Sequence, residues 1–465
     1  MSSIDGPWVT GAFLGVRRRR RWVIAVLVIG LMILGGIILP SRIQPLTDDP
    51  AAFGDDLAGV MVRIRQENTR VEKEHPGAYV TIVALFPMSG LVSEITMSRQ
   101  TIRRGLQGIY VAQFWRNRLP EARPYVKVLV GSNGPKDWEA TLADLDGRAD
   151  AERVVAVTGL GASTAITRRS IAALSERKFA MTAAVITSDE FRKFSGLARV
   201  APLNSDQAVK VLQLARDFHP RLRAVVVKDS NPNDSYVKTL GDYFAGAMRP
   251  EEVEDKLTFD AGAASPGTVL GLNAERICNS TANTVLYAGR NDHLPALMAG
   301  LSARARCIER RITVISGDDV AELNAPKSPQ MWGDQSITLF YTALAHSEGI
   351  REAVAGRVIE AMKQRFRKGV TNSYLTLFPG EDTNDGMAIV HHDAMYVAIE
   401  AVDKFTHQIP GRADVASMLT SGTLVVDGAS GQIRINAGGD AVDKDIPVLQ
   451  LGPDGSTTFS RWATE

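Results

Sequence analysis

Residues 154–164 combine residue types that suit an anion. The stretch reads Val-Val-Ala-Val-Thr-Gly-Leu-Gly-Ala-Ser-Thr, so a β-branched run ends at two glycines, and a helical pattern starts after Thr164. A strand that runs into a helix N-terminus presents free backbone N–H groups and the positive end of a helix dipole. Together with the hydroxyls of Ser163 and Thr164, these groups are suited to a carboxylate. In the alternative interpretation, one of the two hydroxyls is only an N-cap.

Residues that resemble catalytic motifs lack the companions that catalysis needs. Ser175 and Lys178 have S-x-x-K spacing, but they fall at a polar helix end, and neither S-D-N nor K-T-G accompanies them. Residues 131–134 are one residue short of a G-x-S-x-G turn. Gly159 and Gly161 do not complete G-x-G-x-x-G. We therefore predict binding without catalysis and without a cofactor.

A possible metal motif, His391-His392-Asp393, is also weak. Neighbouring residues on a helix point to different sides, and no third ligand has a suitable spacing. We predict no metal site here and interpret Asp393 as the N-cap of a helix that runs to Phe405.

The composition describes a globular protein with no bulk attraction for nucleic acid. The 465 residues are 45% hydrophobic and 23% charged, and 53 Lys and Arg residues stand against 52 Asp and Glu residues. A chain of this length has room for two or three domains.

The N-terminal region predicts a membrane anchor. Five arginines at 17–21 precede eighteen residues without a charge, Trp22 to Leu39. Eighteen helical residues span about 27 Å, close to the thickness of a bilayer core. We predict a basic cytoplasmic tail at 1–21, a single transmembrane helix at 22–40 and an extracytoplasmic remainder. The alternative is a cleaved, secreted protein.

The elements that position the candidate residues alternate between strand and helix. Such alternation predicts parallel sheets covered by helices on both faces. After a polar segment at 41–76, interpreted as a stalk or a leading helix, two sets of alternating elements follow, with a crossing at Pro202. The predicted fold class is α/β, with two Rossmann-like parallel-sheet lobes joined by a hinge. Residues 77–202 and 331–408 would form lobe 1, and residues 203–330 and 409–465 would form lobe 2.

Two cysteines are candidates for one disulfide. Cys278 and Cys307 each lie shortly before a second-lobe strand, at Thr284 and Thr313, so parallel neighbours would bring them together. Their 29-residue separation makes a stabilisation of roughly 3 to 4 kcal/mol reasonable for a crosslink in an exported domain. The alternative is two buried thiols.

The chain resembles the type 1 periplasmic-binding-protein family, specifically the leucine/isoleucine/valine-binding proteins of ABC importers. The resemblance covers about residues 77–460 and depends on the order of several motifs. They are Val-Thr-Gly-Leu-Gly-Ala-Ser-Thr, Phe-Ala-Met-Thr-Ala-Ala-Val-Ile-Thr-Ser-Asp-Glu, Arg-Val-Ala-Pro-Leu-Asn-Ser-Asp-Gln, Asp229 with Tyr236, Tyr-Ala-Gly-Arg, and Val-Ile-Ser-Gly-Asp-Asp.

The resemblance implies a set of ligand-binding residues. In the first lobe, Ser163 and Thr164, together with Val185 and Thr187, would hold the carboxylate and amino group of an amino acid. In the second lobe, Tyr236 would cover the ligand and Asp318 would meet its ammonium group. Arg290 departs from the family pattern, because it stands where a tyrosine is expected, and it would favour a second carboxylate on the ligand.

The resemblance also implies the partners. The chain would capture a small amino-acid-like solute and deliver it to an ABC permease in the membrane. The main alternative is a membrane-anchored ectodomain of a sensor or receptor, with a signalling partner instead of a permease. A hydrolase on the same scaffold is disfavoured, because a nucleophile and a base are missing.

Overall fold

Six strands form the first sheet. The computed structural model describes residues 45–90, 96–120, 124–192, 194–323, 332, 336–347, 364–406 and 408–463. In spatial order the strands are β1, β3, β2, β4, β5 and β6, and only β1 is antiparallel to its neighbour. Their bounds are Leu46–Thr47, Tyr79–Phe86, Tyr125–Ser132, Val154–Gly159, Ala180–Ala183 and Leu197–Arg199 for β1 to β6 in chain order.

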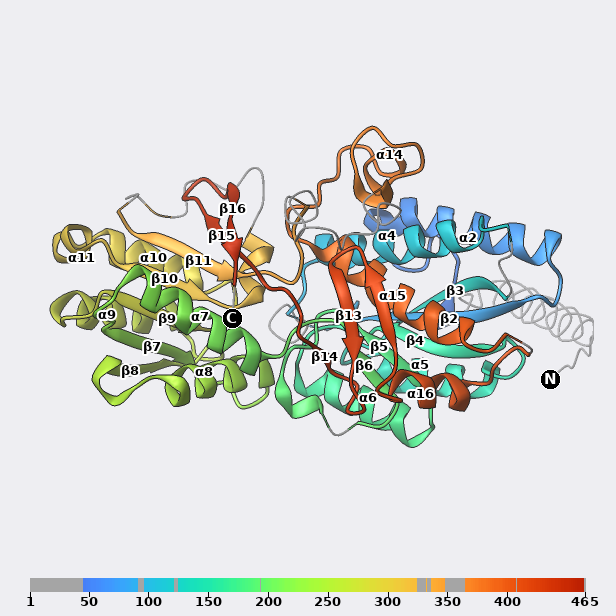
Figure 1. Cartoon of the computed structure of the whole chain (residues 1–465), viewed down its shortest axis with the longest axis horizontal. Coiled ribbons are helices and arrows are strands. Elements are labelled where there is room, and N and C mark those ends of the chain that lie inside the picture. Colours follow the sequence, from blue (N-terminus) through green and yellow to red (C-terminus); the bar gives the residue numbers. More distant parts are fainter. Residues whose placement is uncertain are drawn as a thin grey trace, which may run out of the picture. The chain divides into compact units, whose positions relative to one another are not determined.

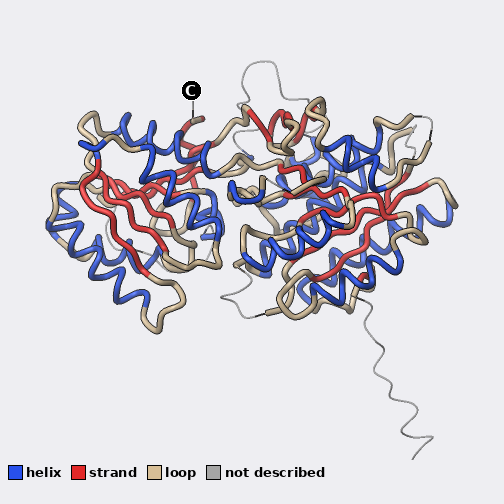
Figure 2. The backbone as a smooth tube through the Cα atoms, turned by 90° about the horizontal axis from the view of Figure 1, so that it is seen from below, coloured by secondary structure: helices blue, strands red, loops and turns tan. Residues whose placement is uncertain are grey.

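Helices cover both faces of this sheet, because its strands are apolar on both faces (Figure 2). Within β2, Val80 and Ile82 belong to the core shared with α2, α4 and α15, whereas Val83 and Leu85 pack toward α5 and α6. The bounds are Asp55–Glu74 for α2, Arg99–Arg116 for α4, Met387–Asp403 for α15, Trp138–Arg148 for α5 and Ala165–Glu176 for α6. Burial on two faces explains the near-continuous apolar runs of these strands.

The helix α15 lies against α4 although the two are far apart in the sequence (Figure 1). A Cβ atom at Gly108 of α4 would overlap the carbonyl oxygen of Ala388 in α15. Glycine therefore permits the close approach of the two helices.

The segment interpreted as a stalk belongs, in its described part, to the first lobe. The strand β1 pairs with β3, and α2 packs on α4 and β3. Leu57, Met61 and Ile64 of α2 are fully buried, and their spacing forms one apolar stripe. A helix was expected here, but its burial against the sheet makes the stalk interpretation wrong.

Seven strands form the second sheet. Their spatial order is β16, β15, β11, β10, β9, β7 and β8, in which β7 to β11 are parallel and β15 and β16 are antiparallel. The bounds are Ala224–Asp229, Val253–Phe259, Thr284–Ala288, Thr313–Ser316 and Thr338–Thr342 for β7 to β11, Pro447–Leu451 for β15 and Thr457–Trp462 for β16. Helices α7 and α8 share the core of one face, and α9, α10 and α11 share that of the other. They span Asn204–Phe218, Ser235–Ala247, Pro266–Asn279, Leu294–Ser302 and Ala305–Arg310.

The division of the chain between the lobes differs from the predicted one. The strand β11 was assigned to the first lobe, but it pairs with β10 of the second sheet. The helix α16, Arg412–Leu419, was assigned to the second lobe, but it packs on β4, β5 and β6. A short apolar run carries no information about which sheet a strand joins. Its periodicity does not even separate a buried strand from part of a buried helix.

A small third sheet accompanies the first lobe. Its strand β12 contacts α15, so the last return to the second lobe falls between β14 and β15. The bounds are Val425–Gly428 for β12, Gly431–Ile435 for β13 and Ala441–Val442 for β14. The predicted assignment of 409–465 to the second lobe holds in the structure only for β15 and β16.

The predicted disulfide is present. Cys278 in α9 and Cys307 in α11 are bonded, with Cα atoms 5.0 Å apart. The strands that follow these helices, β9 and β10, are parallel neighbours as expected. The prediction is confirmed, and the alternative of two thiols is wrong.

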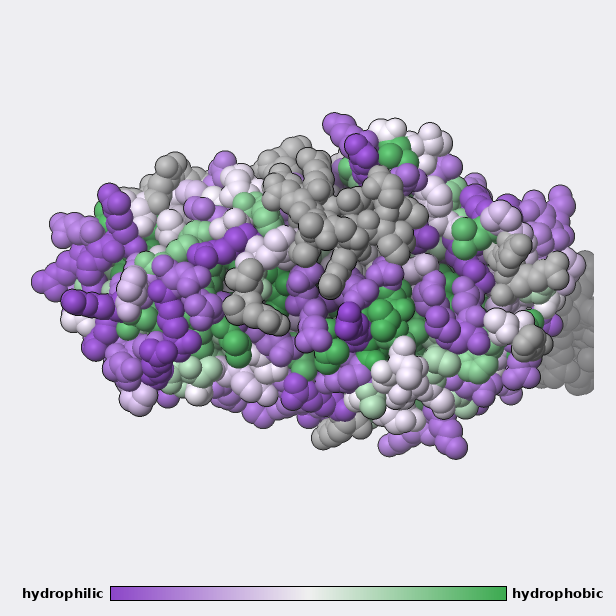
Figure 3. Space-filling model, in the orientation of Figure 1, coloured by the Kyte–Doolittle hydropathy of each residue, from purple (hydrophilic) through white to green (hydrophobic). Residues whose placement is uncertain are grey.

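The predicted basic tail at 1–21 and transmembrane helix at 22–40 lie outside the described residues. Within the described ranges, no helix is both long enough and apolar enough to cross a membrane. On the face shown in Figure 3, hydrophilic residues predominate and the apolar areas between them are small.

Candidate functional site

The turn between β4 and α6 has the geometry that its sequence predicts. Gly159 and Gly161 have φ values of 89° and 80°, in the left-handed region where glycine costs least. Thr164 precedes α6, and its Oγ1 accepts a hydrogen bond from the Thr167 N–H at 3.4 Å. The strand-to-helix turn is thus confirmed, and Thr164 is the N-cap of α6.

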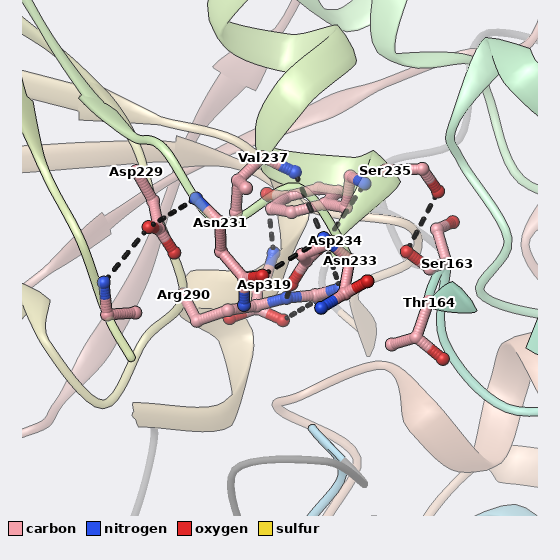
Figure 4. Close-up of polar contacts among 12 residues, drawn as sticks. Ser163, Thr164, Asp229, Asn231, Asn233, Asp234, Ser235, Val237, Arg290 and Asp319 are labelled. Atoms are coloured by element: carbon pink, nitrogen blue, oxygen red, sulfur yellow. Dashed lines mark hydrogen bonds and ion pairs between the residues drawn. The ribbon is translucent and has the colours of Figure 1, made fainter. Parts of the chain in front are cut away.

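This turn contacts the second lobe. The Ser163 carbonyl accepts hydrogen bonds from Tyr236 N–H at 3.3 Å and from Ser235 Oγ at 2.9 Å (Figure 4). Ala165 N–H donates to the Asn233 carbonyl at 2.9 Å. One of the N–H groups at this helix start is therefore bonded to a carbonyl of the chain itself.

The second predicted loop of the first lobe lies beside the same turn. Ser188 N–H donates to Ser163 Oγ at 3.2 Å. Thr187 is fully buried, and its Oγ1 has no hydrogen-bond partner among the described residues. Val185 lines a cavity between the two lobes, whereas Thr187 does not.

Arg290 lies at the centre of the second-lobe side. Its Nε and Nη2 donate to the two carboxylate oxygens of Asp234 at 2.6 and 3.0 Å, and its Nη1 donates to Asp319 Oδ1 at 2.6 Å (Figure 4). Arg290 is only 8% exposed. Burial alone would lower the pKa of the guanidinium, but the two carboxylates outweigh burial and raise that pKa.

Tyr236 is covered by this arginine. The guanidinium carbon of Arg290 lies 4.5 Å from the centre of the Tyr236 ring, within the range of a cation–π contact. The Tyr236 hydroxyl accepts a hydrogen bond from Asp319 N–H at 3.3 Å. The sequence analysis assigned the Tyr236 ring to a ligand, but in the structure this ring contacts Arg290 of the same chain.

A cavity lies between the lobes at this point. The cavity has room for about one water molecule. The first-lobe lining consists of Thr96, Met97, Thr101, Ala162, Val185 and Met387, and the second-lobe lining consists of Tyr236, Arg290, Asp318, Asp319 and Glu322.

Two carboxyl groups of the second lobe have raised pKa values. Burial raises the pKa of Asp318 to about 7, although the hydrogen bond from Gln207 Nε2 at 2.8 Å opposes this rise. Burial, together with the charge of Asp319, also raises the pKa of Glu322. The Glu322 carboxylate accepts a hydrogen bond from Ser98 N–H of the first lobe at 3.2 Å. The cavity wall therefore contains more carboxyl groups than cations.

Solved structures share this arrangement of two lobes. A leucine-binding protein from Thermotoga maritima is 19% identical with a TM-score of 0.60, and the match covers 82% of this chain and 98% of that chain. A branched-chain amino acid transporter substrate-binding protein from Streptococcus pneumoniae, solved with isoleucine, is 14% identical with a TM-score of 0.61, covering 83% and 98%. A solute-binding protein of an ABC transporter from Rhodopseudomonas palustris, solved with 3,4-dihydroxybenzoic acid, is 13% identical with a TM-score of 0.61, covering 83% and 97%.

The chain has the two-lobed fold of these binding proteins. Such identities establish the fold and leave the ligand open. No known family profile and no curated protein sequence matches the chain.

Within this binding-protein fold, most of the predicted site residues come together. Val185, Tyr236, Arg290 and Asp318 line the one cavity. Ser163 and Thr164 lie at the adjoining contact between the lobes, and Thr164 forms an isolated β-bridge with Asp234.

The sequence prediction missed three acidic residues at this site, namely Asp234, Asp319 and Glu322. Asp234 had a local signal, because an aspartate directly before an amphipathic segment is a common N-cap, and its Oδ1 does accept from Tyr236 N–H at 3.0 Å. Asp319 adjoins the predicted Asp318. Glu322 follows one helical turn later in Asp318–Leu323, a short 3-10 segment that the sequence did not indicate.

The His391-His392-Asp393 motif lies elsewhere, in the middle of α15. All three residues are fully buried. Asp393 accepts hydrogen bonds from the N–H groups of Ala429 and Ser430, both at 2.7 Å, and His392 Nδ1 lies 2.9 Å from Asp393 Oδ1. The predicted N-cap at Asp393 is wrong, because the helix begins six residues earlier, at Met387. Asp393 thus joins the helix to the turn between β12 and β13 of the third sheet.

Proposed function

We propose that the two lobes capture a small amino-acid-like solute outside the cytoplasm and deliver it to an ABC importer. The observation that carries this proposal is the cavity between the lobes, whose second-lobe wall contains an aromatic ring and several charged groups. Concave sites with a few convergent polar groups are typical of small-molecule binding.

The proposed ligand contacts follow from the chemistry of each wall. The Asp318 carboxyl would receive the ammonium group of the solute, because a buried carboxylate gains a charge-assisted hydrogen bond from it. When the lobes separate, the contacts of Ser163 and Ala165 with the second lobe break. The N-terminus of α6 then becomes available to a carboxylate, with Thr164 and Thr187 beside it.

The proposal involves binding and no chemical step. Ser175, the serine of the S-x-x-K spacing, lies in the last turn of α6, at the opposite end of the helix from Thr164, and its Oγ donates to the Ser195 carbonyl at 2.9 Å. Ser175 is not among the described residues that line the cavity, whereas Ala162, just before α6, is.

The membrane anchor and the partner belong to the same proposal. The apolar stretch Trp22 to Leu39 after five arginines supports a single transmembrane helix with a cytoplasmic N-terminus. An uncleaved anchor also suits a sensor ectodomain, which is the second candidate. Retention in the membrane pellet after carbonate extraction tests the anchor. Loss of solute uptake in a deletion strain indicates transport, and a lost transcriptional response with normal uptake indicates sensing.

Ligand binding is tested with the full-length chain in detergent. A thermal-shift screen of amino acids, amides and small acids identifies a ligand, and calorimetry then compares Asp318→Asn with a matched control, Asp242→Asn. Asp242 lies on α8, and its side chain is 61% exposed. We expect at least a tenfold loss of affinity for Asp318→Asn and no loss for the control. Equal affinities for both variants would show that the site is elsewhere.

A further inference from the structure

The Arg290 guanidinium is already neutralised by the protein. It makes three hydrogen bonds to two carboxylates, and Asp319 is additionally held by Asn291 N–H at 2.7 Å and Asn291 Nδ2 at 2.9 Å. A guanidinium between two carboxylates has no net charge left for an anion. Arg290 therefore does not provide the second-carboxylate site that its position in the sequence suggests.

The same side chain lines the cavity between the lobes. It lies over the face of Tyr236 and is itself part of the cavity wall, and the remaining interior holds about one water molecule. A guanidinium stacked on an aromatic ring between two carboxylates is the arrangement in which proteins bind a free cation.

The ion pair is connected to the contact between the lobes. Asp234 caps α8, and its chain neighbours Asn233 and Ser235 bond to Ala165 and Ser163 of the first lobe. Because Arg290 binds both oxygens of Asp234, it fixes the turn that touches the first lobe. The ion pair of Arg290 with Asp234 and the hydrogen bonds between the lobes thus belong to one network.

We propose that Arg290 is a tethered cation that occupies the ligand's place, so that the cleft closes on the chain itself. A solute enters by displacing this side chain from Asp234 and Asp319. The inference deepens the proposed function and rests on it for the identity of the cleft as the binding site.

The proposal defines the class of ligand. Removal of Arg290 leaves two buried carboxylates without a counter-charge, and an unpaired buried charge is strongly unfavourable. The displacing solute must therefore bring its own cation, an ammonium or a guanidinium group. A purely anionic solute would bring no such cation to Asp234 and Asp319, which Arg290 pairs with in the structure.

The test uses the full-length chain with Arg290→Ala, Arg290→Lys and a matched control, Arg276→Ala. Arg276 also pairs with an aspartate, Asp255, at 2.7 Å, but its side chain is 63% exposed. Methylguanidinium chloride is the probe, against sodium chloride at equal ionic strength. Spin labels at Leu119→Cys and Leu272→Cys, one exposed residue in each lobe, report the distance between the lobes.

In the expected result, wild type and Arg276→Ala show one short distance without any added solute. Arg290→Ala shows a longer distance, and methylguanidinium restores the short one at a concentration at least tenfold below any that affects wild type or Arg276→Ala. Arg290→Lys, which keeps the charge, retains the short distance. A short distance in Arg290→Ala, or an equal response of all the variants to methylguanidinium, would overturn the proposal.

If Arg290→Ala does not fold, the wild-type chain decides the matter. A long distance in wild type without added solute contradicts a self-occupied cleft, and a short distance together with a short distance in Arg290→Lys supports it. The proposed function fails separately, when no solute of the screen binds any variant. A solute that binds wild type and Arg290→Lys with the same affinity and binds Arg290→Ala no more tightly would leave the function intact and overturn the role of Arg290.

Discussion

The two walls of the interlobe cavity differ in chemistry. The first-lobe wall is built from hydroxyl, methyl and thioether groups, such as those of Thr101, Val185 and Met387. Among the described residues that line the cavity, the charged side chains all belong to the second lobe and include Arg290 and Asp318. If the proposed function is right, the first lobe contributes neutral contacts to the solute, and the charged side chains of the second lobe determine which charge the cavity accepts.

Replacing Arg290 should have the largest effect, because it breaks the buried ion pairs of the charged wall. We expect Arg290→Met to lower the free energy of unfolding by about 3 to 5 kcal/mol, since Asp234 and Asp319 lose the cation that pairs with them. Arg276→Met, which removes an exposed pair, should lower it by less than about 1 kcal/mol. Urea denaturation measures both values. Equal effects would show that the charge on this wall is not effectively buried.

Acid titration should affect the charged wall through Asp318. Asp318 has a pKa of about 7 in the folded chain, against an ordinary value of 3.8, so the folded state binds more protons between these pH values. The Asp318 term in the free energy of unfolding therefore falls as the pH rises from about 4 to about 7. Asp318→Asn removes this contribution, so its stability relative to wild type should rise by up to about 1.4 kcal/mol per pH unit over that range.

Denaturation curves of wild type and Asp318→Asn at pH 5, 6, 7 and 8 measure the difference. Above the folded pKa of about 7 it should become constant. A difference that stays the same from pH 5 to pH 8 would contradict a raised pKa at Asp318.

Removing a hydroxyl from the first lobe should lower the free energy of unfolding by less, and the decrease should not depend on pH. Ser163→Ala removes the acceptor of Ser188 N–H and should lower the free energy of unfolding by about 1 kcal/mol. Ser417→Ala, on the exposed face of α16, is the control, and we expect it to change little. If the effect of Ser163→Ala on the free energy of unfolding changed with pH, the contacts of the first lobe would also depend on a titrating group.

The smallest change in the free energy of unfolding is expected at an exposed ion pair between the lobes, to which the first lobe contributes a carboxylate. Lys238 of α8 donates to Glu190 of the first lobe at 2.6 Å, and the lysine side chain is 54% exposed. Lys238→Ala should lower the free energy of unfolding by less than about 1 kcal/mol, and the effect should shrink at high salt. An effect that resists salt would indicate that this pair is as well shielded as Arg290.

The sequence by itself determined the local features of this protein. Strand and helix periods, the glycine turn before Thr164 and the positions of Cys278 and Cys307 depend on neighbouring residues or on regular alternation. They predicted the α/β class, the helix start at the lobe contact and the disulfide.

Only the tertiary structure decided which sheet β11 joins and what surrounds Arg290. The arginine meets Asp234 and Asp319, which are 56 and 29 residues away in the chain. No local pattern encodes such a pairing, because it depends on the loops of three strands meeting at one edge of the sheet. For this reason the sequence could indicate an arginine beside the cleft, and only the fold could show that Asp234 and Asp319 neutralise its charge.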